Sequence, residues 1–307
     1  MYDVLIIGGG PCGVSAGIYL KRAGYDVAII EKSFIGGQIG LSTELVNYAG
    51  FIEKDSFIFC QNLTKQLKEY DIPIIFAEVV KISRQRDMNF LIQTTNGEYS
   101  SRSCIISIGA ENRKLGFNDE EKFIGRGVSY CAICDGNRYK NKDVLVIGGG
   151  NSAFEDALYL SKICNKVYLI HRTNTFRAEL YLQNEVNSLS TSNGGNVEIL
   201  PFTQIKQIIG EDVIQSVVVN NNGKEINIDV QGVFIAIGRE PKSNFLQGFV
   251  NMDNNYVIVD ENFKTSCDGV YAGGDCINKK VRQVVTAVSD GAIIAKNVAS
   301  YLQNKRG

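Results

Sequence analysis

The sequence predicts an α/β fold in which two Rossmann-like dinucleotide-binding domains share one chain, the second inserted into the first. Three observations support this prediction. Two short apolar runs each lead directly into a glycine-rich turn, at residues 8–13 and 148–153. Strand-like and helix-like stretches alternate around each turn, which favours parallel sheets with helices on both faces. Two similar apolar segments, 104–110 and 233–239, then close the two nucleotide-binding units.

The first turn follows the apolar run Val-Leu-Ile-Ile at 4–7. It matches the G-x-G-x-x-G dinucleotide fingerprint at Gly8, Gly10 and Gly13, with Pro11 directly after the second glycine. The first glycine permits the tight strand-to-helix turn and the second lets the backbone approach a pyrophosphate. The third allows the helix to pack closely on the strand. The pyrophosphate would then lie at a helix N-terminus, where free N–H groups attract an anion.

The second turn follows Val-Leu-Val-Ile at 144–147 and predicts a second nucleotide site. The residues assigned to it are Gly148, Gly150, Asn151, Ser152 and Ala153. An ordinary glycine turn could imitate one such pattern. Both copies, however, stand between a strand-like run and a helix-like stretch, so two nucleotide sites are the favoured interpretation.

The residue at the end of the next strand differs between the two sites. Glu31 ends the first, and a carboxylate there accepts hydrogen bonds from a ribose 2′-hydroxyl. The equivalent position after the second turn is His171, interpreted as a strand-end residue, with Arg172 and Arg177 close by. A carboxylate repels a 2′-phosphate, whereas guanidinium groups bind one. The first site therefore suits FAD (or NAD) and the second NADPH, unless the two arginines are only a solvated cationic surface.

Polar, charged stretches follow both closing segments and mark the crossings between domains. The FAD-binding domain is expected to comprise residues 1–113 and 242–307, and the NADPH-binding domain residues 114–241. Gly109, at the end of the first closing segment, is also assigned to the FAD site. The alanine-rich stretch 283–301 is expected to form a helix of the first domain.

A single Cys-x-x-Cys pair, Cys131 and Cys134, lies inside the second predicted domain. Two cysteines at this spacing can form a disulfide on one short helical turn, where the helix N-terminus stabilises the first thiolate. Such a pair exchanges with other disulfides by thiolate attack. A zinc site needs a second pair at suitable spacing, so no metal is expected; two inert buried thiols are the other alternative. Asp135 follows directly, either as a solvated turn residue or as a carboxyl group that moves the proton this chemistry requires.

Composition narrows the function further. The formal net charge is −1 with acids and bases interspersed, so binding to nucleic acid or to an anionic membrane is not expected. No apolar run approaches the roughly 20 residues that span a bilayer, and no signal peptide is evident. The remaining cysteines are scattered, mostly within apolar runs. They are expected to be buried thiols of a protein in a reducing, cytoplasmic compartment.

Taken together, these motifs resemble the bacterial-type, low-molecular-weight thioredoxin reductases over essentially the whole chain. The family pattern Cys-Ala-x-Cys-Asp-Gly corresponds to residues 131–136, and the family's NADPH turn to residues 148–153. The positions that match the family's flavin contacts are Gly37, Gln38, Asn47, Asp275, Arg282, Gln283 and Val284. A dithiol placed inside the NADPH domain distinguishes this family from the larger disulfide reductases.

The resemblance implies that electrons pass from NADPH through FAD and the Cys131–Cys134 pair to thioredoxin. Cys134 would face the flavin, Cys131 would attack the partner's disulfide and Asp135 would act as the acid. The resemblance also implies a homodimer in which the two domains rotate. One departure is Thr173, where the family usually has a second arginine, and the lost charge weakens the expected preference for NADPH. Two alternatives remain open: the same dithiol serving another disulfide or a peroxidase partner, and a non-enzymatic nucleotide-binding redox sensor.

Overall fold

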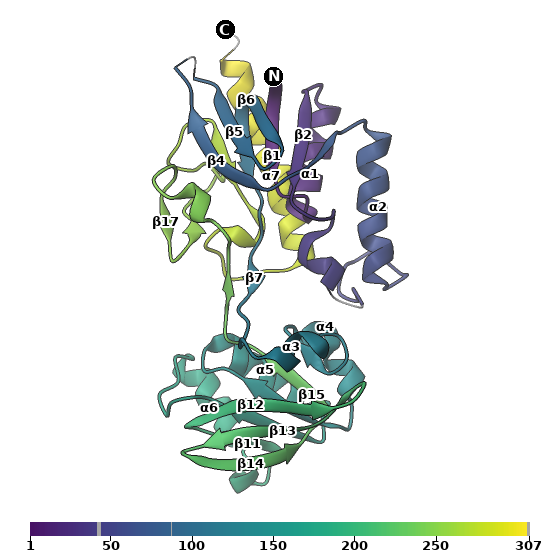
Figure 1. Ribbon diagram of the computed structural model, residues 1–307, viewed down its shortest axis with the longest axis vertical. Helices are drawn as coiled ribbons and strands as arrows, with labels where there is room; N and C mark the ends of the chain where they lie inside the picture. Colours follow the sequence, from purple (N-terminus) through teal and green to yellow (C-terminus); the bar gives the residue numbers. More distant parts are fainter. Residues whose placement is uncertain (42–43, 87, 306–307) are drawn as a thin grey trace. The chain divides into compact units, whose positions relative to one another are not determined.

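The computed structural model describes residues 1–41, 44–86 and 88–305 (Figure 1). The chain divides into two compact units. Unit 1 comprises Met1–Glu111 and Glu240–Gly307, and unit 2 comprises Asn112–Arg239, so unit 2 is inserted between the two segments of unit 1. The connecting segments, β7 (Glu111–Asn112) and β16 (Arg239–Glu240), pair with each other as a two-stranded sheet.

Unit 1 is built on a sheet with strand order β3-β2-β1-β6-β5-β4, in which β19 also pairs with β6. The strands are β1 (Tyr2–Ile7), β2 (Val27–Glu31), β3 (Ile74–Phe76), β4 (Val79–Arg84), β5 (Phe90–Thr94), β6 (Gly97–Ile106) and β19 (Val270–Ala272). The pairs β1–β2, β2–β3, β1–β6 and β6–β19 are parallel, whereas β4–β5 and β5–β6 are antiparallel. A separate small hairpin joins β17 (Met252–Asp253) and β18 (Tyr256–Val257).

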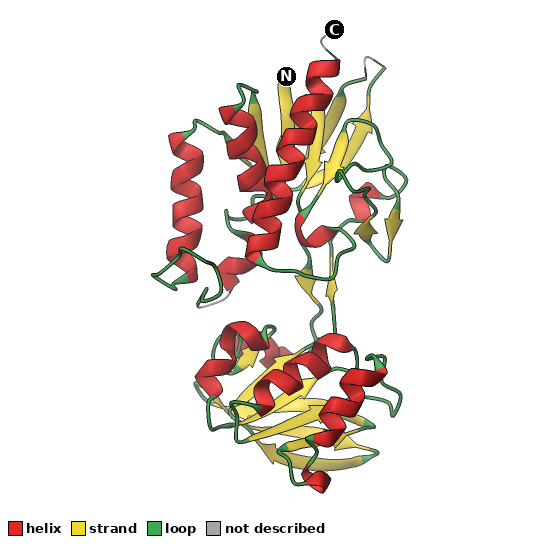
Figure 2. Ribbon diagram, turned by 180° about the vertical axis from the view of Figure 1, so that it is seen from behind, coloured by secondary structure: helices red, strands yellow, loops and turns green. Residues whose placement is uncertain are grey.

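The alternation of side chains along β1 explains the layers of unit 1. The helices of this unit are α1 (Pro11–Arg22), α2 (Ser56–Glu69) and α7 (Val284–Asn304). Val4 and Ile6 lie in one core cluster with the apolar faces of these helices, and Figure 2 shows the three helices on the same face of the sheet. Leu5 and Ile7 lie in a second cluster on the other face. Both faces of β1 are therefore buried from Val4 to Ile7, which is why these four residues are all apolar.

Unit 2 contains a parallel sheet covered by helices on one face and by a second sheet on the other. The parallel strands, in sheet order, are β11 (Val197–Leu200), β10 (Lys166–Ile170), β9 (Asp143–Ile147), β15 (Gly232–Ile235) and β8 (Val128–Ser129). The helices on the first face are α4 (Ala132–Asp135), α5 (Asn151–Ser161) and α6 (Leu180–Ser188), whereas α3 (Asn118–Lys122) lies against β12 of the second sheet. The second sheet is an antiparallel meander of β12 (Thr203–Gly210), β13 (Ile214–Asn221) and β14 (Lys224–Asp229). Val144 and Val146 pack with α5 and α6, and Leu145 and Ile147 pack with the meander.

The predicted α/β fold class is confirmed, because each unit has a parallel sheet flanked by helices. Each glycine turn joins a strand to a helix as expected, β1 to α1 and β9 to α5, and the helix predicted at 283–301 is α7. The meander β12–β14 was not anticipated. Its strands supply Val217 and Val219 to the core of unit 2, so it takes the place of helices on that face of the parallel sheet.

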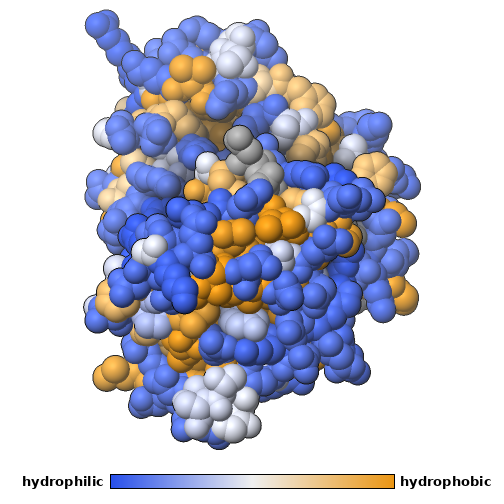
Figure 3. Space-filling view, turned by 60° about the horizontal axis from the view of Figure 1, so that its bottom comes forward, coloured by the Kyte–Doolittle hydropathy of each residue, from blue (hydrophilic) through white to orange (hydrophobic). Residues whose placement is uncertain are grey.

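Hydrophilic side chains cover most of the face drawn in Figure 3 and surround smaller apolar areas. Within the described residues, no helix is long and apolar enough to cross a membrane. The helix α7 is amphipathic instead: Ile294, Val298 and Leu302 are buried at helical spacing and pack into unit 1.

Candidate active site and nucleotide-binding turns

The first glycine turn has the geometry that its three glycines predict. Gly8 has a φ of +105°, and a Cβ there would lie 2.4 Å from the carbonyl oxygen of Ser107. A Cβ at Gly13 would lie 2.0 Å from the carbonyl oxygen of Gly8. At Gly10, by contrast, a Cβ would meet no atom of the described residues within 4 Å. Only the middle position therefore leaves room for a ligand, directly in front of Pro11, the first residue of α1.

Glu31 lies at the end of β2 and contacts this turn. Its Oε2 accepts a hydrogen bond from the backbone N–H of Gly9 at 2.7 Å, and its Oε1 accepts one from the N–H of Ser33 at 2.9 Å. The side chain is buried, with 8% exposure. Each carboxylate oxygen can accept more than one hydrogen bond, so Glu31 keeps acceptor capacity for a ribose hydroxyl. Glu31 thus also holds the turn in place, a role that sequence analysis did not foresee.

Several residues predicted for the first site contact one another although they are distant in the chain. Gly37 begins the 3₁₀ helix η1 (Gly37–Leu41), which also contains Gln38. A Cβ at Gly37 would lie 3.6 Å from the Cα of Gly10. The Asn47 side-chain amide donates to Oε1 of Gln283 at 3.0 Å. Gln283 is the N-cap of α7, so Val284 is the first residue of that helix.

Two of the remaining predicted residues of the first site lie after strands of the same sheet, and the third, Arg282, lies just before α7. Gly109 follows β6 with a φ of +66°, and Asp275 lies in the 3₁₀ helix η5 (Gly274–Cys276), just after β19. The Arg282 guanidinium lies 4.7 Å from the centre of the Tyr256 ring and donates from one terminal nitrogen to the carbonyl oxygen of Ile277. Its Nε is buried and has no hydrogen-bond partner within the described part of the chain. An unpartnered buried donor and an open glycine turn fit a large ligand with anionic and polar groups, as FAD is.

A partly buried ion pair in unit 1 was missed from the sequence. Lys279 Nζ lies 2.7 Å from Oδ2 of Asp290, and the same oxygen accepts a hydrogen bond from the backbone N–H of Gly274 at 2.9 Å. Asp290 therefore fixes the start of η5, next to Asp275. The sequence did carry a signal, because Asp290 is an acidic residue on the apolar face of α7.

The second glycine turn repeats the geometry of the first. Gly148 has a φ of +157°, and a Cβ there would lie 2.4 Å from the carbonyl oxygen of Ala236. A Cβ at Gly150 would meet no described atom within 4 Å. Ala153 takes the third position and is fully buried, whereas Ser152 is exposed. Asn151 exchanges two hydrogen bonds with Glu179, which fixes the segment before α6 against the start of α5.

The predicted 2′-phosphate segment folds over this second turn. A Cβ at Gly149 would lie 2.6 Å from the His171 ring, so the imidazole packs directly on the glycine. The backbone N–H of Arg177 donates to the carbonyl oxygen of Gly149 at 2.6 Å. Burial, together with the guanidinium groups of Arg172 and Arg177, lowers the pKa of His171 below its usual value. His171 is thus a packing residue of the turn, surrounded by positive charge.

Arg172 lines a cavity of about 250 Å³ between the end of β10 and the meander. The other side chains around it include Phe202, Gln204, Asn220 and Asn222. These amides were missed from the sequence because the meander itself was not predicted. The amides of Gln204, Asn220 and Asn222 are neutral hydrogen-bonding groups beside Arg172.

The Cys131–Cys134 pair forms a disulfide, with the two Cα atoms 5.3 Å apart. Cys131 is the N-cap of α4, and its Sγ accepts a hydrogen bond from the backbone N–H of Cys134 at 3.3 Å. Gly136 ends α4, and a Cβ there would lie 2.8 Å from the Tyr159 ring. Because Tyr159 belongs to α5, the disulfide and the second glycine turn share a helix–helix contact inside unit 2.

Asp135, the residue after the pair, is only partly exposed and is held by a neighbour. Its Oδ2 accepts a hydrogen bond from the hydroxyl of Ser129 at 2.6 Å. The Asp135 carboxylate is therefore hydrogen-bonded and partly buried, unlike that of a fully solvated turn residue. Ser129 precedes the pair on β8 and was not singled out from the sequence.

The other cysteines are free thiols, and all but the partly exposed Cys267 are buried, as expected. Burial raises the pKa of the Cys104 and Cys276 thiols to about 12 and that of Cys164 to about 11. Burial also raises the pKa of Cys12 well above its usual value. A thiol with a raised pKa is a poor nucleophile near neutral pH, so these cysteines do not compete with the disulfide pair.

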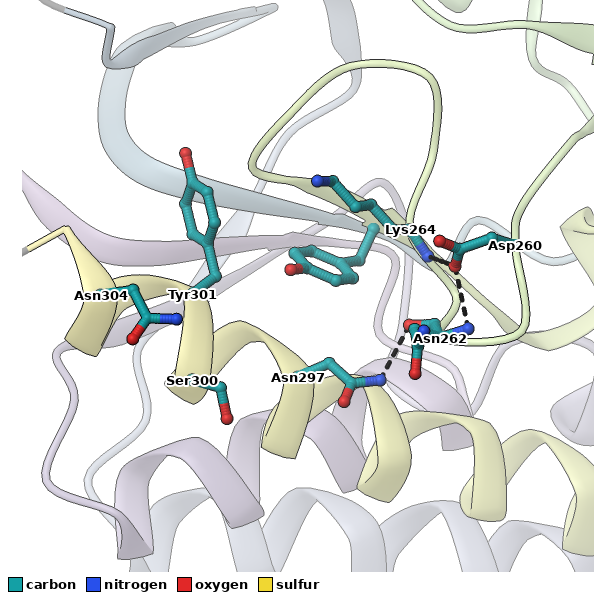
Figure 4. Close-up of a pocket in the computed structure, with 8 residues that line it drawn as sticks. Asp260, Asn262, Lys264, Asn297, Ser300, Tyr301 and Asn304 are labelled. Carbon is teal, nitrogen blue, oxygen red and sulfur yellow. Dashed lines mark hydrogen bonds between the residues drawn. The ribbon is translucent and has the colours of Figure 1, made fainter.

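Unit 1 also contains an open cavity of about 290 Å³ that involves none of the predicted residues. Figure 4 shows its polar lining, where Asp260 accepts from the backbone N–H groups of Asn262 and Lys264 and Asn297 donates to the Asn262 carbonyl oxygen. These groups are hydrogen-bonded to one another, and the residues that line the cavity include neither a glycine turn nor a redox-active cysteine.

Comparison with known proteins agrees with this arrangement. Residues 2–291 match the family described as pyridine nucleotide-disulphide oxidoreductase. The thioredoxin reductase of Treponema pallidum is 37% identical over 98% of this chain and 97% of its own length. That of Listeria monocytogenes is 34% identical over 99% of this chain and 94% of its own. The crystal structure of thioredoxin reductase from Streptococcus pyogenes matches with a TM-score of 0.89 and 34% identity, covering 99% of both chains.

The chain therefore belongs to the pyridine nucleotide-disulphide oxidoreductase family. Its activity is that of a flavoprotein disulfide reductase that uses FAD and NADPH. The family resemblance, the enzyme class and the two cofactors predicted from the sequence are confirmed, and the non-enzymatic alternative is not supported.

Proposed function

We propose that the disulfide substrate of this enzyme is thioredoxin, reduced by the Cys131–Cys134 dithiol. The observation that carries the proposal is the Cys131–Cys134 disulfide at the N-terminus of α4, packed on the helix that begins at the second glycine turn. The relatives named above are called thioredoxin reductases and align over nearly the whole chain.

We assign FAD to the predicted domain 1–113 and 242–307, and NADPH to the predicted domain 114–241. FAD would be held by the open turn at Gly10, by Glu31 and by the Arg282–Gln283 segment, and NADPH by the turn at Gly150 with Arg172 and Arg177. The support is the open space at both middle glycines and the charge at the end of the second strand, which is acidic in one unit and basic in the other. Bound NADPH supplies a hydride, and bound FAD passes its two electrons to the disulfide.

The chemistry of the dithiol follows from thiol–disulfide exchange. The Cys131 thiol loses its proton and attacks one sulfur of the thioredoxin disulfide as the thiolate, that S–S bond breaks, and the leaving sulfur takes up the proton that Cys131 lost. The Cys134 thiol then loses its proton and attacks Cys131 Sγ, which re-forms the Cys131–Cys134 bond and releases the second thioredoxin sulfur. Two electrons and two protons pass to thioredoxin. The Cys134 N–H, which already donates to Cys131 Sγ, stabilises a thiolate there.

We further propose that the enzyme is a cytoplasmic homodimer. Support for the compartment is the set of free cysteines outside the redox pair, all but Cys267 buried, which suits a reducing environment. Support for the dimer is the family resemblance. Sedimentation of the purified flavoprotein at micromolar concentration tests the dimer directly, and a monomer would contradict it.

The Cys131→Ser and Cys134→Ser variants test the proposed substrate and path together. Each should lose thioredoxin reduction while NADPH still bleaches the flavin absorption band, because hydride transfer precedes disulfide exchange. Cys267→Ser, which changes a partly exposed free cysteine, is the matched control and should retain wild-type turnover. Appreciable thioredoxin turnover by Cys131→Ser or by Cys134→Ser would contradict the proposal.

A further inference from the structure

Ser129 lies at the end of β8, two positions before Cys131, and its side chain is nearly inaccessible. Its hydroxyl donates to Oδ2 of Asp135 at 2.6 Å. The hydroxyl oxygen of Ser129 also accepts a hydrogen bond from the backbone N–H of Cys131 at 3.1 Å. One buried hydroxyl therefore joins the backbone of the first cysteine to the carboxyl group that follows the second.

The hydroxyl has a single proton and two possible acceptors. Besides Asp135 Oδ2, the Cys131 carbonyl oxygen lies 3.3 Å from Ser129 Oγ. The shorter distance and the charge of a carboxylate both favour Asp135. The Ser129 lone pairs remain available for the Cys131 N–H, so all three hydrogen-bonding roles of the hydroxyl are consistent with one arrangement.

The two oxygens of Asp135 are not equivalent. Oδ2 is occupied by the Ser129 hydroxyl, whereas Oδ1 is buried and has no hydrogen-bond partner among residues 1–41, 44–86 and 88–305. When this carboxyl group carries a proton, the proton therefore sits on Oδ1, because Oδ2 already accepts one. We propose that Ser129 is a positioning residue that fixes the Asp135 carboxyl and directs its transferable proton to Oδ1.

This inference rests on the proposed function and completes its proton balance. When Cys134 attacks Cys131 Sγ, the Cys134 proton must leave, and the released partner sulfur must gain one. Asp135 Oδ1 accepts the first proton and returns one to the leaving sulfur, so the carboxyl ends the cycle unchanged. Ser129 keeps its own proton throughout and acts only by holding Asp135.

A double-mutant cycle separates this role from a merely structural one. Ser129→Ala should lower kcat with thioredoxin about tenfold, the order expected for losing a hydrogen bond to a charged group. The rate of flavin reduction by NADPH should stay unchanged. In the Asp135→Asn background, the same Ser129→Ala change should have little further effect, because the group it positions no longer exchanges a proton. Ser129→Thr keeps the hydroxyl and should recover most of the activity.

Ser103→Ala is the matched control, since Ser103 is a fully buried serine of unit 1 whose hydroxyl donates to the Gly269 carbonyl oxygen. It should leave kcat unchanged. Wild-type turnover by Ser129→Ala would overturn the proposal. So would an equal fall in kcat when Ser129→Ala is made in the wild type and in the Asp135→Asn background. Urea midpoints of each variant identify any fall in kcat that is caused by unfolding. If wild type reduced a small synthetic disulfide but not thioredoxin, the proposed partner would be wrong, and the cycle would be decided with that disulfide instead.

Discussion

The two glycine turns use the same backbone geometry and differ in the residue that covers them. A Cβ at Gly8 or at Gly148 would lie 2.4 Å from a carbonyl oxygen, that of Ser107 in unit 1 and of Ala236 in unit 2. The middle glycines, Gly10 and Gly150, are both open. The shape of the turn is therefore set by packing that both units share, and it does not by itself distinguish the nucleotides.

The distinction lies at the end of the following strand. In unit 1, Glu31 accepts a hydrogen bond from the N–H of Gly9, and in unit 2 the His171 ring packs against Gly149. Both residues thus cover the same glycine of their turn, one through a carboxylate and one through a flat ring among arginines. The same contact that stabilises each turn also sets the local charge that a ribose or its phosphate would meet.

The largest effect should come from the third position of the turn, where unit 1 has Gly13 and unit 2 has Ala153. Gly13→Ala places a Cβ 2.0 Å from the Gly8 carbonyl oxygen, so the turn must open. We expect loss of bound FAD and a destabilisation of about 1–3 kcal/mol from overpacking. The reverse change, Ala153→Gly, should cost only about 0.5–1 kcal/mol, the usual effect of glycine in a helix.

Flavin content after purification and the urea midpoint measure both changes. If Gly13→Ala retained FAD and had a urea midpoint no lower than that of Ala153→Gly, the view that α1 must pack closer to its glycine turn than α5 does would be wrong.

The next prediction concerns Glu31. Glu31→Ala leaves the buried Gly9 N–H without its acceptor, which costs about 1–3 kcal/mol. FAD retention should fall and the preference for NADPH should stay the same. Because part of the loss comes from the turn itself, the apoprotein should also unfold at a lower urea concentration. His171→Ala is the matched variant in unit 2 and should retain FAD. If Glu31→Ala changed only the KM for NADPH, the two sites would be assigned the wrong way round.

The smallest effects concern the arginines of unit 2. Replacing Arg172 and Arg177 together by Ala should raise the KM for NADPH about tenfold or more, equivalent to about 1.4 kcal/mol, and leave the use of NADH unchanged. Thr173→Arg should move the preference further toward NADPH by restoring a third cation. The measurement is the ratio of kcat/KM for the two nucleotides. A ratio that neither variant moves would identify these arginines as a solvated surface only.

The features that could be predicted from the sequence are those set by residues close together in the chain. The strand–turn–helix pattern at Gly8 and Gly148 is local, since an apolar run, a glycine that adopts positive φ and a helix start lie within a few residues. The contacts of Ser129 with Asp135, of Glu31 with Gly9 and of Arg172 with the meander could not be read in this way. The Ser129–Asp135 hydrogen bond spans only six residues but depends on how the chain turns between β8 and α4, and the other two contacts depend on how distant segments pack. Polar residues at all these positions are equally compatible with exposed turns.

The return of the chain to unit 1 has a consequence for its synthesis. The strand β19 pairs with β6, and α7 packs in one cluster with α1, so residues after 269 complete a core that residues 2–22 begin. A ribosome adding roughly 5–20 residues per second delivers the two parts tens of seconds apart. Unit 2, a single continuous segment, is complete before that interval ends and can fold first. Until α7 is synthesised, the apolar side of α1 has no partner and is exposed on the nascent chain. Exposed apolar surface of this kind is what chaperones cover.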